Sequence, residues 1–140
     1  MTVAVIARAV VRASGEDAQK YLHSQLSNDI ASLKTGESVH SFLLEPTGRV
    51  VALLRVTRTG DSDFLLDFDD GPGVADAVVA RLNRFRIRVK VDFVLTELSC
   101  VAFRGESPVG EPDGVVVNAW WGDCVDLITT RRDKWSPDDG

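Results

Sequence analysis

The chain has 140 residues, of which 44% are hydrophobic and 26% charged, and its net charge at pH 7 is −5. This composition predicts one globular domain, or one domain and a fragment, and argues against a protein that coats nucleic acid nonspecifically. No apolar run reaches the roughly 20 residues that span a bilayer. Residues 1–5 lack the basic flank and cleavage site of a signal peptide, so we expect a cytoplasmic protein.

Cysteine and histidine spacing predicts neither a metal centre nor a nucleophilic site. Cys100 and Cys124 lie far apart, and neither has a second ligand at zinc spacing. We expect both to be reduced, small core residues. His23 and His40 have no plausible nucleophile beside them, so no catalytic triad is predicted.

The first quarter of the chain predicts a strand followed by a helix. The β-branched run 3–11 is typical of a strand and stops at Ser14-Gly15. Ser14 and Asp17 form a start that resembles a capping box. The helix after it has a core face with apolar residues at helical spacing: Ala18, Tyr21, Leu22 and Leu26.

The middle of the chain predicts a hairpin, a further strand and a second helix. Runs 38–45 and 49–57 read as strands joined by the turn Pro46-Thr47-Gly48. A strand beginning at residue 64 follows. Pro72 then suits the first turn of a helix, whose apolar stripe is Val74, Val78, Leu82 and Phe85.

Residues 84–91 alternate between basic and apolar side chains. This pattern predicts that the second helix passes into a strand with apolar residues on one face and Arg86, Arg88 and Lys90 on the other. The basic face has two interpretations: a surface that binds polyanions, or a solvated face that discourages edge pairing.

The order of elements predicts an α+β fold, in which two helices pack on one face of a mostly antiparallel sheet. A strand is expected at 98–103, and a hairpin at 115–121 and 125–130. We expect a first domain at 1–104, a linker at 105–113 that is rich in Gly, Pro and acidic residues, and at 114–140 the start of a second, incomplete domain with a polar tail.

Several segments resemble one family in the same order and at similar spacing. They are residues 13–30, which end in Gln25-Leu26-Ser27-Asn28-Asp29-Ile30, and residues 43–50, 82–85 and 88–91. The chain resembles the N-terminal domain of YgfZ-type folate-binding proteins and of the glycine-cleavage T-protein (aminomethyltransferase) superfamily. The YgfZ signature Lys-Gly-Cys-Tyr-x-Gly-Gln-Glu has no match around either cysteine, so the chain is expected to be shorter than the family's full pattern.

The resemblance implies a domain that binds tetrahydrofolate and is not itself catalytic, with a role in iron–sulfur cluster assembly or repair and in tRNA modification. It points to Gln25, Asn28 and Asp29 as polar groups near the pterin, and a folate glutamate tail needs cations such as Arg86 and Arg88. The alternative for Asn28 and Asp29 is that they cap the helix end or the next turn.

Two other functions stay open. In an aminomethyltransferase, the resemblance would make Asp76 the residue that orients folate for one-carbon transfer, although an Asp near a helix start also favours the helix dipole. An RNA-interaction module would use Arg84, Arg86, Arg88 and Lys90.

Overall fold

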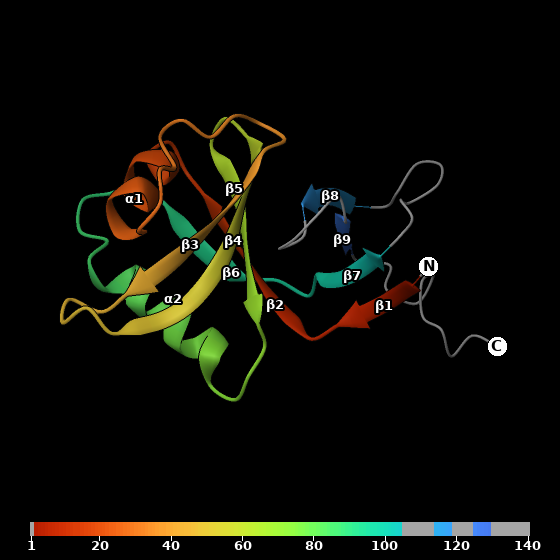
Figure 1. The fold of residues 1–140 in the computed structure, drawn as a ribbon. Coiled ribbons are helices and arrows are strands. Elements are labelled where there is room, and N and C mark those ends of the chain that lie inside the picture. The colour runs from red at the N-terminus through yellow and green to blue at the C-terminus, as the bar shows by residue number, and fades with distance from the viewer. Residues whose placement is uncertain (1, 105–113, 119–124, 130–140) are drawn as a thin grey trace. The chain divides into compact units, whose positions relative to one another are not determined.

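The structure, a computed structural model, describes residues 2–104, 114–118 and 125–129 (Figure 1). The chain forms two compact units. One unit is Ala9–Thr96, and the other combines Met1–Arg8 with Glu97–Gly140. Among the described residues, no helix has the length and apolar character needed to cross a membrane.

The larger unit is built on a five-stranded sheet with the strand order β3-β4-β5-β2-β6. The pairs β3–β4, β4–β5 and β2–β6 are antiparallel. The strands are β2 (Arg8–Ser14), β3 (Ser38–Leu44), β4 (Val50–Gly60), β5 (Asp63–Asp69) and β6 (Asp92–Leu95), and the helices are α1 (Ala18–Gln25) and α2 (Val74–Arg84) (Figure 1).

Both helices pack on the same face of this sheet, because one core cluster contains residues from both of them and alternate residues of the strands. Leu54 and Val56 of β4 belong to this cluster together with Leu22 of α1 and Leu82 of α2. The predicted apolar stripe of α1 is confirmed, since Ala18, Tyr21, Leu22 and Leu26 are buried. The α+β prediction is confirmed.

The hairpin prediction is also confirmed, with β3 and β4 joined at Pro46-Thr47-Gly48. Glu45 N–H donates to the Arg49 carbonyl at 2.7 Å, and Gly48 N–H donates to the Glu45 carbonyl at 2.8 Å. Gly48 has φ 90°, which a glycine adopts without a steric penalty.

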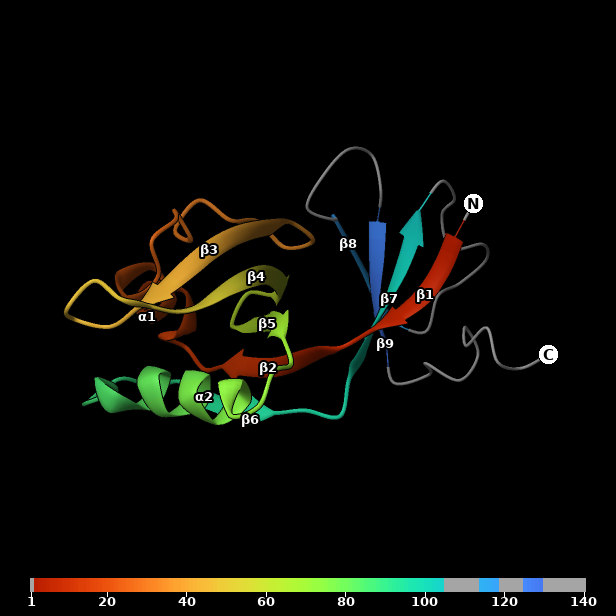
Figure 2. The same cartoon turned by 60° about the horizontal axis from the view of Figure 1, so that its bottom comes forward.

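The smaller unit contains a second sheet with the order β1-β7-β9-β8 (Figure 2). Its strands are β1 (Thr2–Ile6), β7 (Ser99–Arg104), β8 (Gly114–Asn118) and β9 (Val125–Thr129). All three pairs are antiparallel. Val101, Phe103 and Leu127 form its buried cluster, against which Val5 packs.

The expectation of one strand over 3–11 is wrong, because β1 ends at Ile6 and β2 begins at Arg8, in a different sheet. A continuous apolar run reports burial but cannot show that its two halves pair with different partners. The predicted linker 105–113 and the tail 131–140 lie outside the described residues. The domain limits 1–104 and 114–140 stay a prediction. In the structure, strand pairing places β1 and β7 in one sheet with β8 and β9.

The start of α1 differs from the predicted capping box. Ser14 is the last residue of β2, and Asp17 occupies the N-cap position without a side-chain capping bond. The Asp17 carboxylate instead accepts a hydrogen bond from Lys90 N–H at 2.9 Å. The side chain that would have capped the helix is therefore used in a tertiary contact.

The predicted basic strand over 84–91 is wrong. Arg84 is the last residue of α2, β6 begins at Asp92, and no strand is assigned between them. Arg88 has φ 58°, a left-handed conformation that interrupts an extended chain. The backbone of Lys90 is bonded to Asp17 rather than to a strand, so the alternating side chains do not share a sheet face.

Candidate functional site

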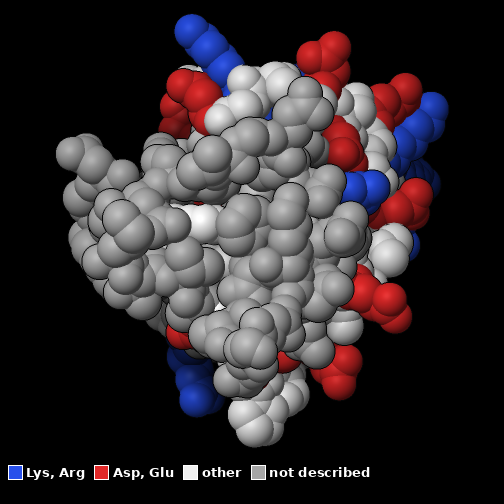
Figure 3. Space-filling view, turned by 90° about the vertical axis from the view of Figure 1, so that its right-hand side faces the viewer, with Lys and Arg blue, Asp and Glu red and all other residues white. Residues whose placement is uncertain are grey.

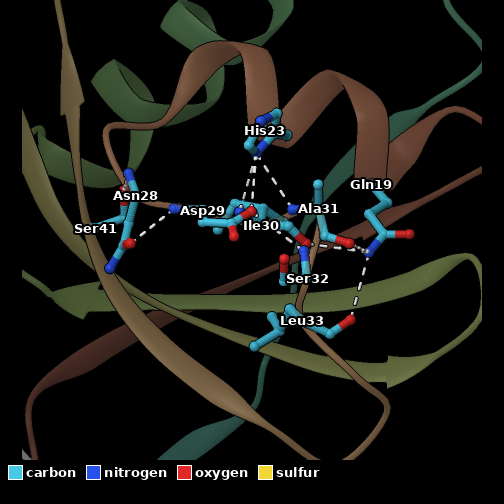
Figure 4. Close-up of polar contacts among 9 residues, drawn as sticks. All are labelled: Gln19, His23, Asn28, Asp29, Ile30, Ala31, Ser32, Leu33 and Ser41. Atoms are coloured by element: carbon cyan, nitrogen blue, oxygen red, sulfur yellow. Dashed lines mark hydrogen bonds and ion pairs between the residues drawn. The ribbon is translucent and has the colours of Figure 1, made fainter.

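The polar loop after α1, residues 27–33, contains two of the predicted folate contacts and is held by two side chains of α1 (Figure 4). His23 Nδ1 accepts hydrogen bonds from Ile30 N–H at 3.1 Å and Ala31 N–H at 3.2 Å. Gln19 Nε2 donates to the carbonyls of the same two residues, at 3.1 and 3.0 Å. Gln19 and His23 are four residues apart, so they lie on one face of the helix, and both form hydrogen bonds with the backbone of the loop.

Asn28 connects this loop to β3. Its Nδ2 donates to the His40 carbonyl at 2.9 Å, its Oδ1 accepts from Asp29 N–H at 2.7 Å, and its own N–H donates to Ser41 Oγ at 3.0 Å. The amide of Asn28 is thus engaged with the backbone on both sides. This is the geometry of a residue that shapes a turn.

Asp29 presents a carboxylate at the surface of the loop. Its Oδ1 accepts from Ser32 N–H at 3.2 Å and lies 3.5 Å from His23 Nδ1, and its side chain is 55% exposed. Hydrogen bonds from the Ser32 side chain and backbone lower the pKa of Asp29. The site therefore offers a fixed negative charge that can accept hydrogen bonds from an amine.

Gln25 is used in a contact between the two helices. Its Oε1 accepts from Arg81 Nη1 at 3.0 Å, and its Nε2 donates to Ser24 Oγ at 3.1 Å. Arg81 Nε also donates to the Leu44 carbonyl at 2.8 Å, so one buried guanidinium joins α1, α2 and the end of β3. The contacts of Arg81 were not predicted from the sequence. The available signal was its position as a charged residue next to Leu82, on the apolar stripe of α2.

The basic residues predicted to share a strand face have separate environments. Arg84 lies 3.6 Å from Glu45, and Lys90 lies 3.0 Å from Glu16. Arg86 donates to the Val91 carbonyl at 2.7 Å and lies 3.3 Å from Asp92. Arg88 forms no ion pair with a described residue. Around the rim of the view in Figure 3, basic and acidic side chains are likewise interspersed.

Asp76 lies in the first turn of α2, where its negative charge favours the helix dipole. Its side chain is exposed. The structure places it on α2, whereas Asn28 and Asp29 follow α1, and no hydrogen bond among the described residues joins it to them.

A groove of about 500 Å³ lies between the β3–β4 turn and α2. Pro46, Val50 and Ala77 contribute apolar surface, and Arg49 and Arg84 contribute cations. No group of three or more His, Cys, Asp or Glu residues within the described part of the chain is arranged to hold a metal ion.

Comparison with known proteins identifies relatives among aminomethyltransferases. No family model matches the chain. It is 28% identical over 99 residues to an uncharacterized protein of Haemophilus influenzae, covering 69% of this chain and 34% of that protein. It is 27% identical over 99 residues to an aminomethyltransferase of Koribacter versatilis, covering 71% and 26%.

The glycine cleavage system aminomethyltransferase T of Bartonella henselae has the same fold over 90% of this chain and 40% of its own, with a TM-score of 0.73 and 21% identity. The fold is therefore that of part of an aminomethyltransferase T. Together with the sequence similarities, it supports the T-protein superfamily that the sequence motifs indicated. The chain spans about a third or less of the length of these curated relatives.

Proposed function

We propose that this chain is the folate-binding part of a YgfZ-type protein that binds tetrahydrofolate in the cytoplasm and serves iron–sulfur cluster assembly or repair and, through it, tRNA modification. The observation that carries the proposal is the fold shared with aminomethyltransferase T over 90% of the chain. The motifs that resemble YgfZ-type folate-binding proteins and the T-protein imply tetrahydrofolate as the ligand, and the similarity to an aminomethyltransferase supports this choice.

The described residues fit part of what folate requires. The exposed, ionised carboxylate of Asp29 suits the amine edge of a pterin, and Arg88, which has no ion pair among the described residues, suits a glutamate carboxylate. Arg86 is a second cation for the tail, although it also bonds the Val91 carbonyl. Gln25 and Asn28 would act by holding α1 and the polar loop in place, because their amides are already engaged.

The experiment that tests this proposal is a calorimetric titration of the 140-residue chain with reduced tetrahydrofolate. We expect binding that weakens in Asp29→Asn and in the double variant Arg86→Ala, Arg88→Ala. Lys34→Ala is the matched control, since Lys34 is an exposed cation outside the proposed contacts. Binding that is equal in all variants would contradict these contacts.

A second measurement separates the YgfZ role from folate binding. Deletion of the gene is expected to lower the activity of iron–sulfur enzymes, and the full-length protein is expected to restore it. Fully active iron–sulfur enzymes in the deletion strain, together with a full-length protein that does not bind tetrahydrofolate, would refute the proposal.

The similarity to the aminomethyltransferase of K. versatilis favours a second candidate, an enzyme that transfers a one-carbon unit to tetrahydrofolate. Asp76 would then orient the folate. Aminomethyl transfer by the full-length protein that persists in Asp76→Ala would argue against this role.

The RNA alternative loses its basic strand, and three of its four cations lie within 4 Å of a carboxylate. It predicts RNA affinity that falls steeply with salt.

A further inference from the structure

A second pocket, of about 210 Å³, lies between α1 and the segment that contains Arg88 and Val89. One side of the pocket is lined by the N-cap residue Asp17 and by Lys20, Tyr21 and Ser24 of α1. Asp17 and Ser24 each lie three or four positions from both Lys20 and Tyr21, so the four residues share one side of the helix. Because a water molecule occupies about 30 Å³ in the liquid, the pocket has room for a small organic or inorganic ion.

The pocket contains two cations that form no ion pair with a described residue, Lys20 and Arg88. By contrast, Arg86 and Lys90 on either side of Arg88 each have a carboxylate nearby. The Asp17 carboxylate also lines the pocket, but it already accepts the Lys90 N–H at 2.9 Å. Two cations and one carboxylate leave the lining with a net positive formal charge.

The wall that carries Arg88 is fixed in place. Asp17 N–H donates to the Lys90 carbonyl at 3.1 Å, which complements the bond from Lys90 N–H to the Asp17 carboxylate. Gly15 permits this close approach, since a Cβ there would lie 2.1 Å from the Lys90 carbonyl oxygen. The backbone of this segment is thus held in place before a ligand binds.

Arg88 is, among the described residues, the only one besides glycines with a positive φ. Such a conformation is strained and persists where the surroundings impose it, often at ligand sites. The constrained backbone of Arg88 and the two cations thus belong to the same pocket.

We propose that this pocket binds a small oxyanion, a carboxylate or a phosphate group. Arg88 supplies a planar fork for two oxygens, Lys20 supplies a second cation, and Tyr21 and Val89 supply the apolar wall behind them. The proposal adds Lys20, which the sequence did not single out. It does not require folate, because a glutamate carboxylate is one source of this chemistry and a phosphate monoester is another.

The test is a titration of the 140-residue chain with inorganic phosphate and, separately, with glutarate, at constant ionic strength. Backbone amide shifts in NMR spectra report the position of binding. We expect saturable shifts in residues 17–24 and 88–90, with an affinity that falls about tenfold in each of Lys20→Ala and Arg88→Gln. Lys34→Ala removes the same charge outside the pocket and is expected to bind as the unaltered chain does.

Saturation by phosphate alone would assign the pocket to phosphate groups, and saturation by glutarate would assign it to carboxylates. Failure of both ions to saturate, or unchanged affinity in Lys20→Ala and Arg88→Gln, would overturn the proposal. Lys20→Ala keeps α1 intact because alanine is the best helix former. A chain that binds these ions but not tetrahydrofolate would contradict folate binding by this chain while supporting this inference.

Discussion

Asp17 and Lys90 exchange two hydrogen bonds although they are 73 positions apart in the chain. The N–H of each donates to the other, in one case to a carbonyl at 3.1 Å and in the other to a carboxylate at 2.9 Å. This pair fixes the segment after α2 to the start of α1. It explains why a sequence that alternates like a strand does not form one there.

Gly15→Ala is expected to lower the free energy of unfolding by about 2–4 kcal/mol, because the new Cβ would lie 2.1 Å from the Lys90 carbonyl oxygen and φ is 142°. Urea denaturation measures this loss. Gly48→Ala is the control, with φ 90° but no atom within 4 Å of its Cβ, and should cost about 1 kcal/mol. Equal losses in the two variants would show that the contact with Lys90 is unimportant.

Tyr21→Phe is expected to cost about 1–2 kcal/mol, because the Tyr21 hydroxyl donates to the Leu82 carbonyl at 2.6 Å in the last turn of α2. The ring contact with Phe93, at 5.9 Å between centroids, stays in the variant. Equilibrium unfolding in urea at neutral pH gives the difference, and a variant as stable as the original would argue against this bond.

The same variant gives a pH signature. Burial raises the pKa of Tyr21 above its ordinary value of 10.0. The hydroxyl therefore contributes its full stabilisation below pH 10, and this is lost as the pH rises through the pKa of the folded state. The advantage of the original chain over Tyr21→Phe is expected to shrink at alkaline pH. An advantage that grows with pH would contradict the burial effect.

Arg55 and Asp67 form a buried ion pair between neighbouring strands, with Nε–Oδ1 and Nη2–Oδ2 distances of 3.0 and 2.7 Å. Removal of either partner leaves a buried charge, so Arg55→Met or Asp67→Leu alone should cost about 3–5 kcal/mol. The double variant should cost much less than the sum. Thermal unfolding of the four proteins completes the double-mutant cycle, in which additive losses would exclude a coupled pair.

Ser32→Ala is expected to raise the pKa of Asp29 towards its ordinary value, because the Ser32 side chain is the first cause of its lowering. NMR titration of the Asp29 carboxyl carbon measures the shift. Ser24→Ala is the control, since that hydroxyl donates to the Tyr21 carbonyl. A group with a lowered pKa stabilises the fold at pH values above its ordinary pKa, and this stabilisation is lost as the pH falls through the pKa of the folded state.

The free energy of unfolding of Asp29→Asn should therefore depend less on pH in the acid range than that of the original chain.

Local patterns predicted much of the larger unit. The apolar spacing in α1, the Pro46-Thr47-Gly48 turn and the stripe of α2 each concern residues within a few positions of one another. Periodicity reports which side of an element is apolar, and it was enough for α1 and for Val78 and Leu82 of α2. Phe85, the last residue of the predicted α2 stripe, lies at the C-cap and is 41% exposed. The polar residues after α1 were also predicted from the sequence. The hydrogen bonds of Gln19 and His23 with the backbone of their loop were not predicted.

The sequence by itself determined the type of most elements and the polar character of the segment that follows α1. Only the tertiary structure decided that residues 3–11 divide between two sheets, that Arg81 joins α1 to α2 and β3, and that Lys20 and Arg88 line one pocket. Each of these depends on partners far away in the chain. A residue's local pattern carries its preference for burial, whereas the identity of its partner is fixed only when the whole chain packs.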